Sequence, residues 1–295
     1  LPALGALAVA ISPHDQARVH RMLAALFSVG AFVVSLGIWS GFDVALPGFQ
    51  MVEDVAGLPF SARYQVGVDG INLLLVLLTT LVTPLAIIGA FGAVKMRTRE
   101  FYLAMLLLES CILGTLVSMD LLLFYLFWEF MLVPMALIIG VWGGPRRVYA
   151  AVKFFLYTFL GSVLMLVGII YLNVTSEASG FSYLDFVASP VSAPEQMWLF
   201  LAFGLAFAVK VPLWPFHTWL PDAHVEAPTP GSVILAAVML KMGTYGFLRF
   251  AIPLFPEAAG AFALPVMVLG AVGIVIGSLV AYAQEDIKRL VAYSS

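Results

Sequence analysis

The chain has 295 residues, of which 62% are hydrophobic and 11% are charged, with a net charge of −3 and a mean hydropathy of +1.05. Soluble globular proteins carry about 25% charged residues, so this composition excludes a soluble protein, and the net charge provides no basic surface for nucleic acid. The single cysteine, Cys111, excludes an intrachain disulfide and a cluster held by several thiols.

Apolar runs follow one another along the whole chain. A bilayer core about 30 Å thick is spanned by about 20 apolar residues in a helix, so we expect an all-α, polytopic membrane protein that forms a single domain over 1–295. The first run is short and begins with Leu, which predicts a trimmed start, and a last helix begins at Lys288. The predicted helices are 1–11, 20–40, 70–94, 101–118, 120–142, 150–174, 197–219, 229–251 and 261–283.

The connections between these runs differ in charge. If successive connections alternate between two sides, one side receives nine basic residues, and the positive-inside rule makes that side cytoplasmic and places the amino terminus outside. The basic residues are Arg18, Arg21, Lys95, Arg97, Arg99, Arg146, Arg147, Lys288 and Arg289, and the opposite connections carry the acids Asp43, Glu53, Asp54, Asp69, Glu177, Asp185, Glu195 and Glu257.

Four ionisable residues lie near the centres of apolar runs: Glu109, Glu129, Lys210 and Lys241. Each costs about 2.5–3.5 kcal/mol at the membrane midplane. Salt bridges that brace helices are one explanation, but replacing a buried ion pair by apolar residues is often neutral or stabilising. Two acids and two bases on four helices therefore favour a path for charge transfer over a purely structural role.

Glu129 and Lys210 are expected to form the switchable part of that path. A buried ammonium binds its proton less tightly, and a nearby carboxylate opposes this effect. A lysine can therefore release its proton when the carboxylate moves away, whereas an arginine stays charged. Because both residues lie at a similar depth in their runs, we expect them to approach directly or through one water.

The run that contains Lys210 also contains Pro212 and Pro215. Each proline removes a backbone donor, and an interrupted helix is tolerated at membrane depth only where it is buried or lines a cavity. Many membrane prolines only kink a helix, but broken helices with ionisable residues also build ion sites in transporters. The sequence predicts a helix that loses regular geometry between Lys210 and Pro215.

His217 and His224 follow Lys210 at steps of seven, a spacing that shares one face of an unbroken helix. Histidine titrates near physiological pH, which suits a proton relay. For His224, a solvated loop residue is the alternative, and a metal site with Asp222 and Glu226 has no recognised ligand spacing. Farther along the chain, Gly243 and Gly246 are expected to leave room for water beside Lys241.

Five strings resemble one family. Residues 132–135 and 241–246 point to the chain M group of the antiporter-like subunits of proton-pumping NADH:quinone oxidoreductase (respiratory complex I), relatives of mitochondrial subunit 4. Residues 215–224 are shared with the sister chains L and N and with Mrp-type sodium/proton antiporters. The strings are FWEFMLVPM at 127–135, PFHTWLPDAH at 215–224, APTPGS at 227–232, LKMGTYG at 240–246 and DIKRLVAYSS at 286–295.

The resemblance implies an antiporter-like helix bundle with inverted five-helix repeats, each with one broken helix. The first repeat covers about 101–251, and the second is expected beyond Ser295, in a chain truncated before it. The roles that carry over are the pair partner, the switchable lysine, the central relay lysine, two relay or uptake histidines and a peripheral acid: Glu129, Lys210, Lys241, His217, His224 and Glu109.

The implied function is proton translocation within NADH:quinone oxidoreductase, coupled to electron transfer in other subunits. The sequence has neither a nucleotide-binding glycine loop nor cluster-ligand cysteines, so FMN, iron–sulfur clusters and quinone are expected in other subunits. The expected partners are sister antiporter-like chains and the lipid bilayer, in a bacterial inner membrane rather than a mitochondrial one. An Mrp-type sodium/proton antiporter subunit and a structural membrane scaffold are the alternatives.

Overall fold

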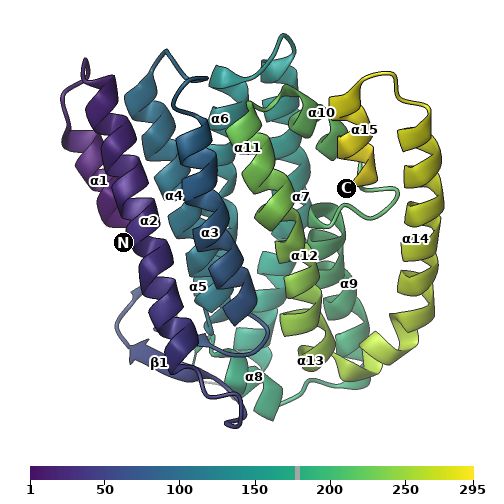
Figure 1. Ribbon diagram of the computed structural model, residues 1–295. Helices are drawn as coiled ribbons and strands as arrows, with labels where there is room; N and C mark the ends of the chain where they lie inside the picture. Colours follow the sequence, from purple (N-terminus) through teal and green to yellow (C-terminus); the bar gives the residue numbers. More distant parts are fainter. Residues whose placement is uncertain (177–179) are drawn as a thin grey trace.

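A computed structural model describes residues 1–176 and 180–295, so Glu177 lies outside the described residues. The long helices run roughly side by side, with α1 and α2 at one edge of the bundle, α14 at the other, and α11 and α12 between α3 and α9 (Figure 1). Six helical stretches of the described part are long and apolar enough to span a bilayer. They are α2 (Ala17–Gly41), α4 (Thr98–Val117), α5 with α6 (Leu121–Phe130 and Leu132–Trp142), α7 (Arg147–Thr175), the stretch Thr229–Leu254, and α14 (Pro256–Tyr282).

The shorter elements complete the bundle and cover one end of it. A β-hairpin forms in the predicted connection 41–69, with Gln50 opposite Val68 and Val55 opposite Tyr64. A short helix lies in the connection after α7. These elements are α1 (Pro2–Ile11), β1 (Gln50–Val55), a 3₁₀ turn (Pro59–Ser61), β2 (Tyr64–Val68), α3 (Leu73–Gly89), α8 (Tyr183–Ala188), α9 (Ala193–Lys210), α10 (Trp219–Glu226) and α15 (Ile287–Ser294).

The connections alternate between two faces of the bundle, as the charge pattern predicts. On one face, here the basic face (connections 90–97, 143–146 and 283–286), Trp142 donates a 2.9 Å hydrogen bond to the Met96 carbonyl. On the other, the acidic face (connections 42–72 and 180–192), Met119 donates to the Gln65 carbonyl over 2.8 Å. In Figure 1, α10 and α15 lie at the basic end and β1 and α8 at the acidic end.

Three predicted helices contain an interruption or an irregular segment: the one in 197–219 was predicted, and those in 120–142 and 229–251 correct a continuous prediction. The run 120–142 divides at Met131, because Pro134 has no N–H for the Phe130 carbonyl. The run 197–219 leaves helical geometry after Lys210 and resumes at Trp219. The run 229–251 extends to Leu254 and contains two π-helical segments. Its parts are α11 (Thr229–Ile234), the π segment Leu235–Met239, α12 (Leu240–Gly246), the π segment Phe247–Ala251 and α13 (Ile252–Leu254).

The core brings α9 into close contact with two neighbours. An added Cβ at Gly161 of α7 would lie 2.9 Å from a Val209 methyl carbon. On the other side, a Cβ at Gly243 of α12 would lie 2.8 Å from the Phe207 carbonyl oxygen. Only glycine permits these approaches, so α7, α9 and α12 pack at backbone distance around the end of α9, and Lys210 is the last residue of that helix.

Candidate functional site: a buried lysine at a helix break

Lys210 is 1% exposed and ends α9 in the interior of the bundle. Its Nζ lies 5.0 Å from the centre of the Trp128 ring, which offers a cation–π contact. Nζ has no hydrogen-bond partner. A buried charged group is ordinarily paired and hydrogen-bonded, so the surroundings of Lys210 stabilise its charged form less than such pairing would.

The break beside Lys210 is held by its own hydrogen bonds. Val211 N–H still donates to the Phe207 carbonyl and Leu213 N–H to the Ala208 carbonyl, each over 2.8 Å. The indole of Trp219, which begins α10, donates to the Val209 carbonyl over 2.8 Å. The Ala208 and Val209 carbonyls at the interruption therefore have partners, and the predicted loss of helical geometry after Lys210 is confirmed.

Glu129 lies near the end of α5, opposite the end of α9. The Asp120 carboxylate fixes the start of α5, because it accepts hydrogen bonds from Leu123 N–H over 2.9 Å and from Arg63 N–H over 3.0 Å. Oε1 of Glu129 accepts a hydrogen bond from the Ser162 hydroxyl of α7. Oε2 is buried without a hydrogen-bond partner.

Glu129 and Lys210 do not form a direct ion pair, and the expected approach through one water stays a prediction. The ion pairs of residues 1–176 and 180–295 join other side chains, and this pair is not among them. Instead, Glu129 is bound by Ser162 and Lys210 lies over Trp128, the residue before Glu129 on α5. Each of the two groups has an unused hydrogen-bonding position, at Oε2 of Glu129 and at Nζ of Lys210.

Lys241 differs from Lys210 in its surroundings. Its side chain is exposed, and Nζ donates to the Ala236 carbonyl within the first π segment. The expectation that Gly243 and Gly246 leave room for water is wrong, because Phe207 and Val211 of the neighbouring chain segment fill that space. The glycines serve close packing against α9, and Lys241 lies on a different side of its helix.

The two histidines do not share one face with Lys210. His217 lies in the irregular segment between α9 and α10 and lines a cavity of about 650 Å³ bordered by α14 and α15. His224 is 5% exposed in α10 and lines a second cavity of about 820 Å³, together with Lys288. The shared face was expected only for an unbroken helix, and the helix is interrupted between Lys210 and Trp219.

The acids near these histidines are bound to basic side chains. Asp222 accepts hydrogen bonds from Arg146 over 3.0 Å and from Lys153 over 2.7 Å. Glu226 accepts a 2.9 Å bond from the backbone N–H of Arg146. This cluster ties α10 to the start of α7 at the basic face.

Glu109 stands apart from the other candidates. It lies in α4, is fully buried, and neither carboxylate oxygen has a hydrogen-bond partner. Among the described residues, the side-chain hydrogen bonds and the cation–π contact of Glu129 and Lys210 do not involve Glu109, and its peripheral role stays a prediction.

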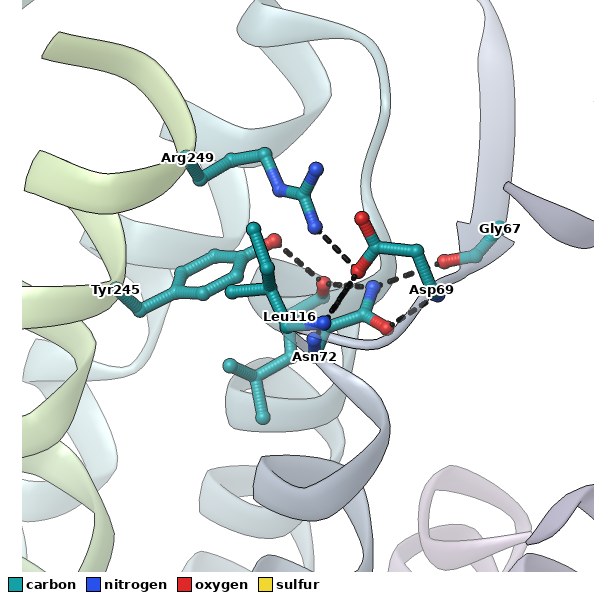
Figure 2. A network of polar contacts seen from close by, with 7 residues as sticks. Gly67, Asp69, Asn72, Leu116, Tyr245 and Arg249 are labelled. Carbon is teal, nitrogen blue, oxygen red and sulfur yellow. Dashed lines mark hydrogen bonds and ion pairs between the residues drawn. The ribbon is translucent and has the colours of Figure 1, made fainter. Parts of the chain in front are cut away.

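A buried polar network near the acidic face was missed by the sequence reasoning. Figure 2 shows Arg249, in the second π segment, directed at Asp69, with Nη2 2.5 Å from Oδ1. Tyr245 donates to the Leu116 carbonyl over 2.8 Å, and the Asn72 amide donates to the same carbonyl over 2.9 Å. An arginine within an apolar run was the available signal, but its partner precedes it by 180 residues.

Comparison with known proteins identifies the family. The sequence profile described as "NADH:quinone oxidoreductase/Mrp antiporter, TM" matches residues 118–295. NADH-quinone oxidoreductase subunit M of Rhodobacter capsulatus is 51% identical over 289 residues, which cover 94% of this chain and 56% of that protein. NADH-ubiquinone oxidoreductase chain 4 of Marchantia polymorpha is 43% identical over 297 residues, covering 100% of this chain and 60% of that protein.

Two solved structures share the fold. A chain of respiratory complex I from Thermus thermophilus with bound NADH superposes with a TM-score of 0.87 at 32% identity, covering 99% of this chain and 60% of that chain. A chain of the Mrp complex from Dietzia sp. DQ12-45-1b gives a TM-score of 0.83 at 24% identity, covering 99% of this chain and 32% of that chain. The sequence thus spans little more than half of the curated relatives it matches. It belongs to the NADH:quinone oxidoreductase/Mrp antiporter family of multi-pass membrane proteins.

Proposed function

We propose that this chain is part of a proton-translocating, antiporter-like membrane subunit of an NADH:quinone oxidoreductase. The observation that carries the proposal is Lys210, a fully buried lysine without a hydrogen-bond partner at the break between α9 and α10. The names of the subunit M relatives support the same assignment. Electron transfer, with its FMN, iron–sulfur clusters and quinone, belongs in this proposal to other subunits.

The proposed mechanism uses the unequal surroundings of Glu129 and Lys210. When the carboxylate turns from Ser162 toward Lys210, the ammonium form gains a counter-charge and keeps its proton. When the carboxylate turns back, Lys210 is left over Trp128 without a partner and gives up its proton. Lys241 is the proposed next carrier, with His217 and His224 on the uptake route and Glu109 at its edge.

We further propose a bacterial inner membrane, with sister antiporter-like chains as neighbours. The Rhodobacter and Rickettsia relatives support a bacterial location, and the match to a complex I chain supports neighbours in a membrane arm. The basic face is proposed to be cytoplasmic, with the amino terminus on the other side.

The test compares Lys210→Met with Lys95→Met, which removes an exposed lysine at the basic face. Both variants are made in the full-length protein within the assembled complex. NADH-driven acidification of inverted membrane vesicles is followed with a pH-sensitive dye. Positioned proton transfer contributes about 10²–10⁴-fold, so we expect at least about a tenfold loss in Lys210→Met and none in Lys95→Met. Normal acidification in an assembled Lys210→Met complex would contradict the function.

The family description also covers Mrp antiporters, so a sodium/proton antiporter subunit is the second candidate. Sodium exchange would make vesicle acidification depend on a sodium gradient and not on NADH. Acidification that follows NADH oxidation without sodium, together with purification alongside NADH dehydrogenase subunits, is the expected outcome for the first candidate.

A further inference from the structure

Ser162 hydrogen-bonds the Glu129 carboxylate, with Oγ as the donor to Oε1. It is fully buried on α7. Its hydroxyl also lies 3.1 Å from the Thr158 carbonyl and 2.9 Å from the Phe159 carbonyl of its own helix. A serine hydroxyl has one proton to donate, so the bond to Glu129 competes with two bonds inside α7.

The position of Ser162 relative to Lys210 is fixed by backbone packing. Its neighbour Gly161 packs directly against Val209, the residue before Lys210. A Cβ added at Gly161 would lie 2.9 Å from a Val209 methyl carbon. The hydroxyl of α7 and the ammonium of α9 are therefore anchored on two helices that pack without room to slide. Pairing of Glu129 with Lys210 therefore requires a movement of side chains and not a shift of these two helices.

A hydroxyl is suited to hold Glu129 in both of its charge states. It donates to the carboxylate, and when Glu129 is protonated it can accept the carboxyl hydrogen while donating to the Thr158 carbonyl. Neither a methyl group nor a permanent cation can do both. The Ser162 hydroxyl thus matches a carboxyl group that changes protonation state.

We propose that Ser162 is a positioning residue that holds Glu129 away from Lys210, so that the two charges pair only when the Ser162 bond breaks. This role of Ser162 rests on the proposed function, because it explains how Glu129 and Lys210 are kept apart between proton transfers. Lys210 is then free of a carboxylate partner in the resting arrangement, as its unpartnered Nζ indicates.

The test uses Ser162→Ala, Ser162→Thr and the matched control Ser28→Ala in the assembled complex. Ser28 is a fully buried serine of α2 whose hydroxyl bonds only its own helix, at the Ala25 carbonyl. The first readout is the infrared carbonyl band of protonated Glu129, assigned by its loss in Glu129→Gln. A protonated carboxyl group that loses the hydrogen bond of its O–H to Ser162 has its carbonyl band at higher wavenumber, so we expect such a shift in Ser162→Ala and not in Ser28→Ala.

The second readout is a structure of the Ser162→Ala complex, in which we expect a carboxylate oxygen of Glu129 within ion-pair distance of the Lys210 Nζ. NADH-driven acidification should fall several-fold in Ser162→Ala and recover in Ser162→Thr, which restores a hydroxyl. The Tyr125 hydroxyl, one turn earlier on α5, borders Glu129 and Ser162. An unchanged band, or a carboxylate that turns to Tyr125 instead of Lys210, would overturn the proposal.

Failure of the proposal and failure of the function are distinguishable. If Lys210→Met acidifies vesicles normally while the Ser162→Ala band still shifts, Ser162 positions Glu129 but the pair does not carry protons. If Lys210→Met stops acidification and the Ser162→Ala band stays unchanged, the function holds and Ser162 has no positioning role. If Ser162→Ala does not assemble, the band and the structure are measured in Ser162→Cys, whose weak thiol donor predicts a smaller shift in the same direction.

Discussion

Lys210 and Lys241 are both lysines in membrane helices, yet the structure gives them opposite surroundings. Lys210 is enclosed, beside an aromatic ring and without a hydrogen-bond partner. Lys241 is exposed and bonds a carbonyl of its own helix. The difference follows from neighbouring residues, because Gly243 and Gly246 turn one side of the Lys241 helix into a contact with α9 and leave the lysine on another side.

At the residue scale, we expect Lys241 to act as a proton carrier rather than as a fixed positive charge. Lys241→Ala should lower NADH-driven acidification at least about tenfold, since positioned proton transfer contributes about 10²–10⁴-fold. Lys241→Arg should also be impaired, because a guanidinium does not release its proton. Dye quenching in vesicles, normalised to the amount of assembled complex, measures both. Full acidification by Lys241→Arg would show that a constant positive charge suffices.

At the element scale, the stretch 229–254 is joined to distant parts of the chain by buried polar contacts. Its second π segment supplies Arg249, whose ion pair with Asp69 fastens the helix to the start of α3. The guanidinium carbon also lies 4.7 Å from the centre of the Phe49 ring. π-helical turns recur at functional sites, and here one of them directs a charged side chain toward the end of the β-hairpin.

We expect Asp69→Ala to destabilise the protein strongly, because Arg249 would be left buried without its counter-charge. Breaking a buried ion pair by removing one partner costs about 3–5 kcal/mol. The matched control is Asp54→Ala, which breaks an ion pair with Arg63 whose side chains are 43% and 30% exposed and whose loss costs at most about 1 kcal/mol. The thermal midpoint of the purified complex measures both variants.

A double variant separates the lost attraction from the stranded charge. Asp69→Ala combined with Arg249→Met removes both charges, so it should be more stable than Asp69→Ala alone. A double variant that is less stable than either single one would show that the network stabilises through its other hydrogen bonds, such as those of Tyr245 and Asn72.

At the scale of the whole molecule, the two faces of the bundle define its orientation in the membrane. We expect the basic face to be cytoplasmic, since Lys and Arg are retained on that side. The test starts from Cys111→Ala, which removes the single native cysteine. Met96→Cys then reports the basic face, and Val44→Cys reports the acidic face, from positions that are 59% and 89% exposed.

An impermeant maleimide should label Met96→Cys in inverted vesicles and Val44→Cys in intact cells or right-side-out vesicles. The opposite pattern would reverse the orientation. Labelling of both positions from one side would instead contradict the alternation of connections, which the hydrogen bonds at each end of the bundle support.

The amino-acid sequence by itself determined the membrane fold, the approximate helix bounds, the alternation of the connections and the break after Lys210. Each of these follows from local properties: apolar length, loop charge and the missing N–H of proline. The resemblance of its strings to antiporter-like subunits agrees with the family profile that matches 118–295. Glu109, Glu129, Lys210 and Lys241 were found because a charge in an apolar run is visible without any partner.

Only the tertiary structure decided which of these charges meet. Ser162 binds Glu129 across 33 residues of chain and Arg249 binds Asp69 across 180, and no local pattern specifies such a partner. The packing of glycines against Val209 and Phe207 fixed which helix sides face inward, so Lys241 lies on a different side of its helix from Gly243 and Gly246. The break between α9 and α10 places His217 and His224 beside different cavities. Side-chain pairing depends on how helices rotate and approach, and that is set by contacts between distant segments rather than by the sequence of any one helix.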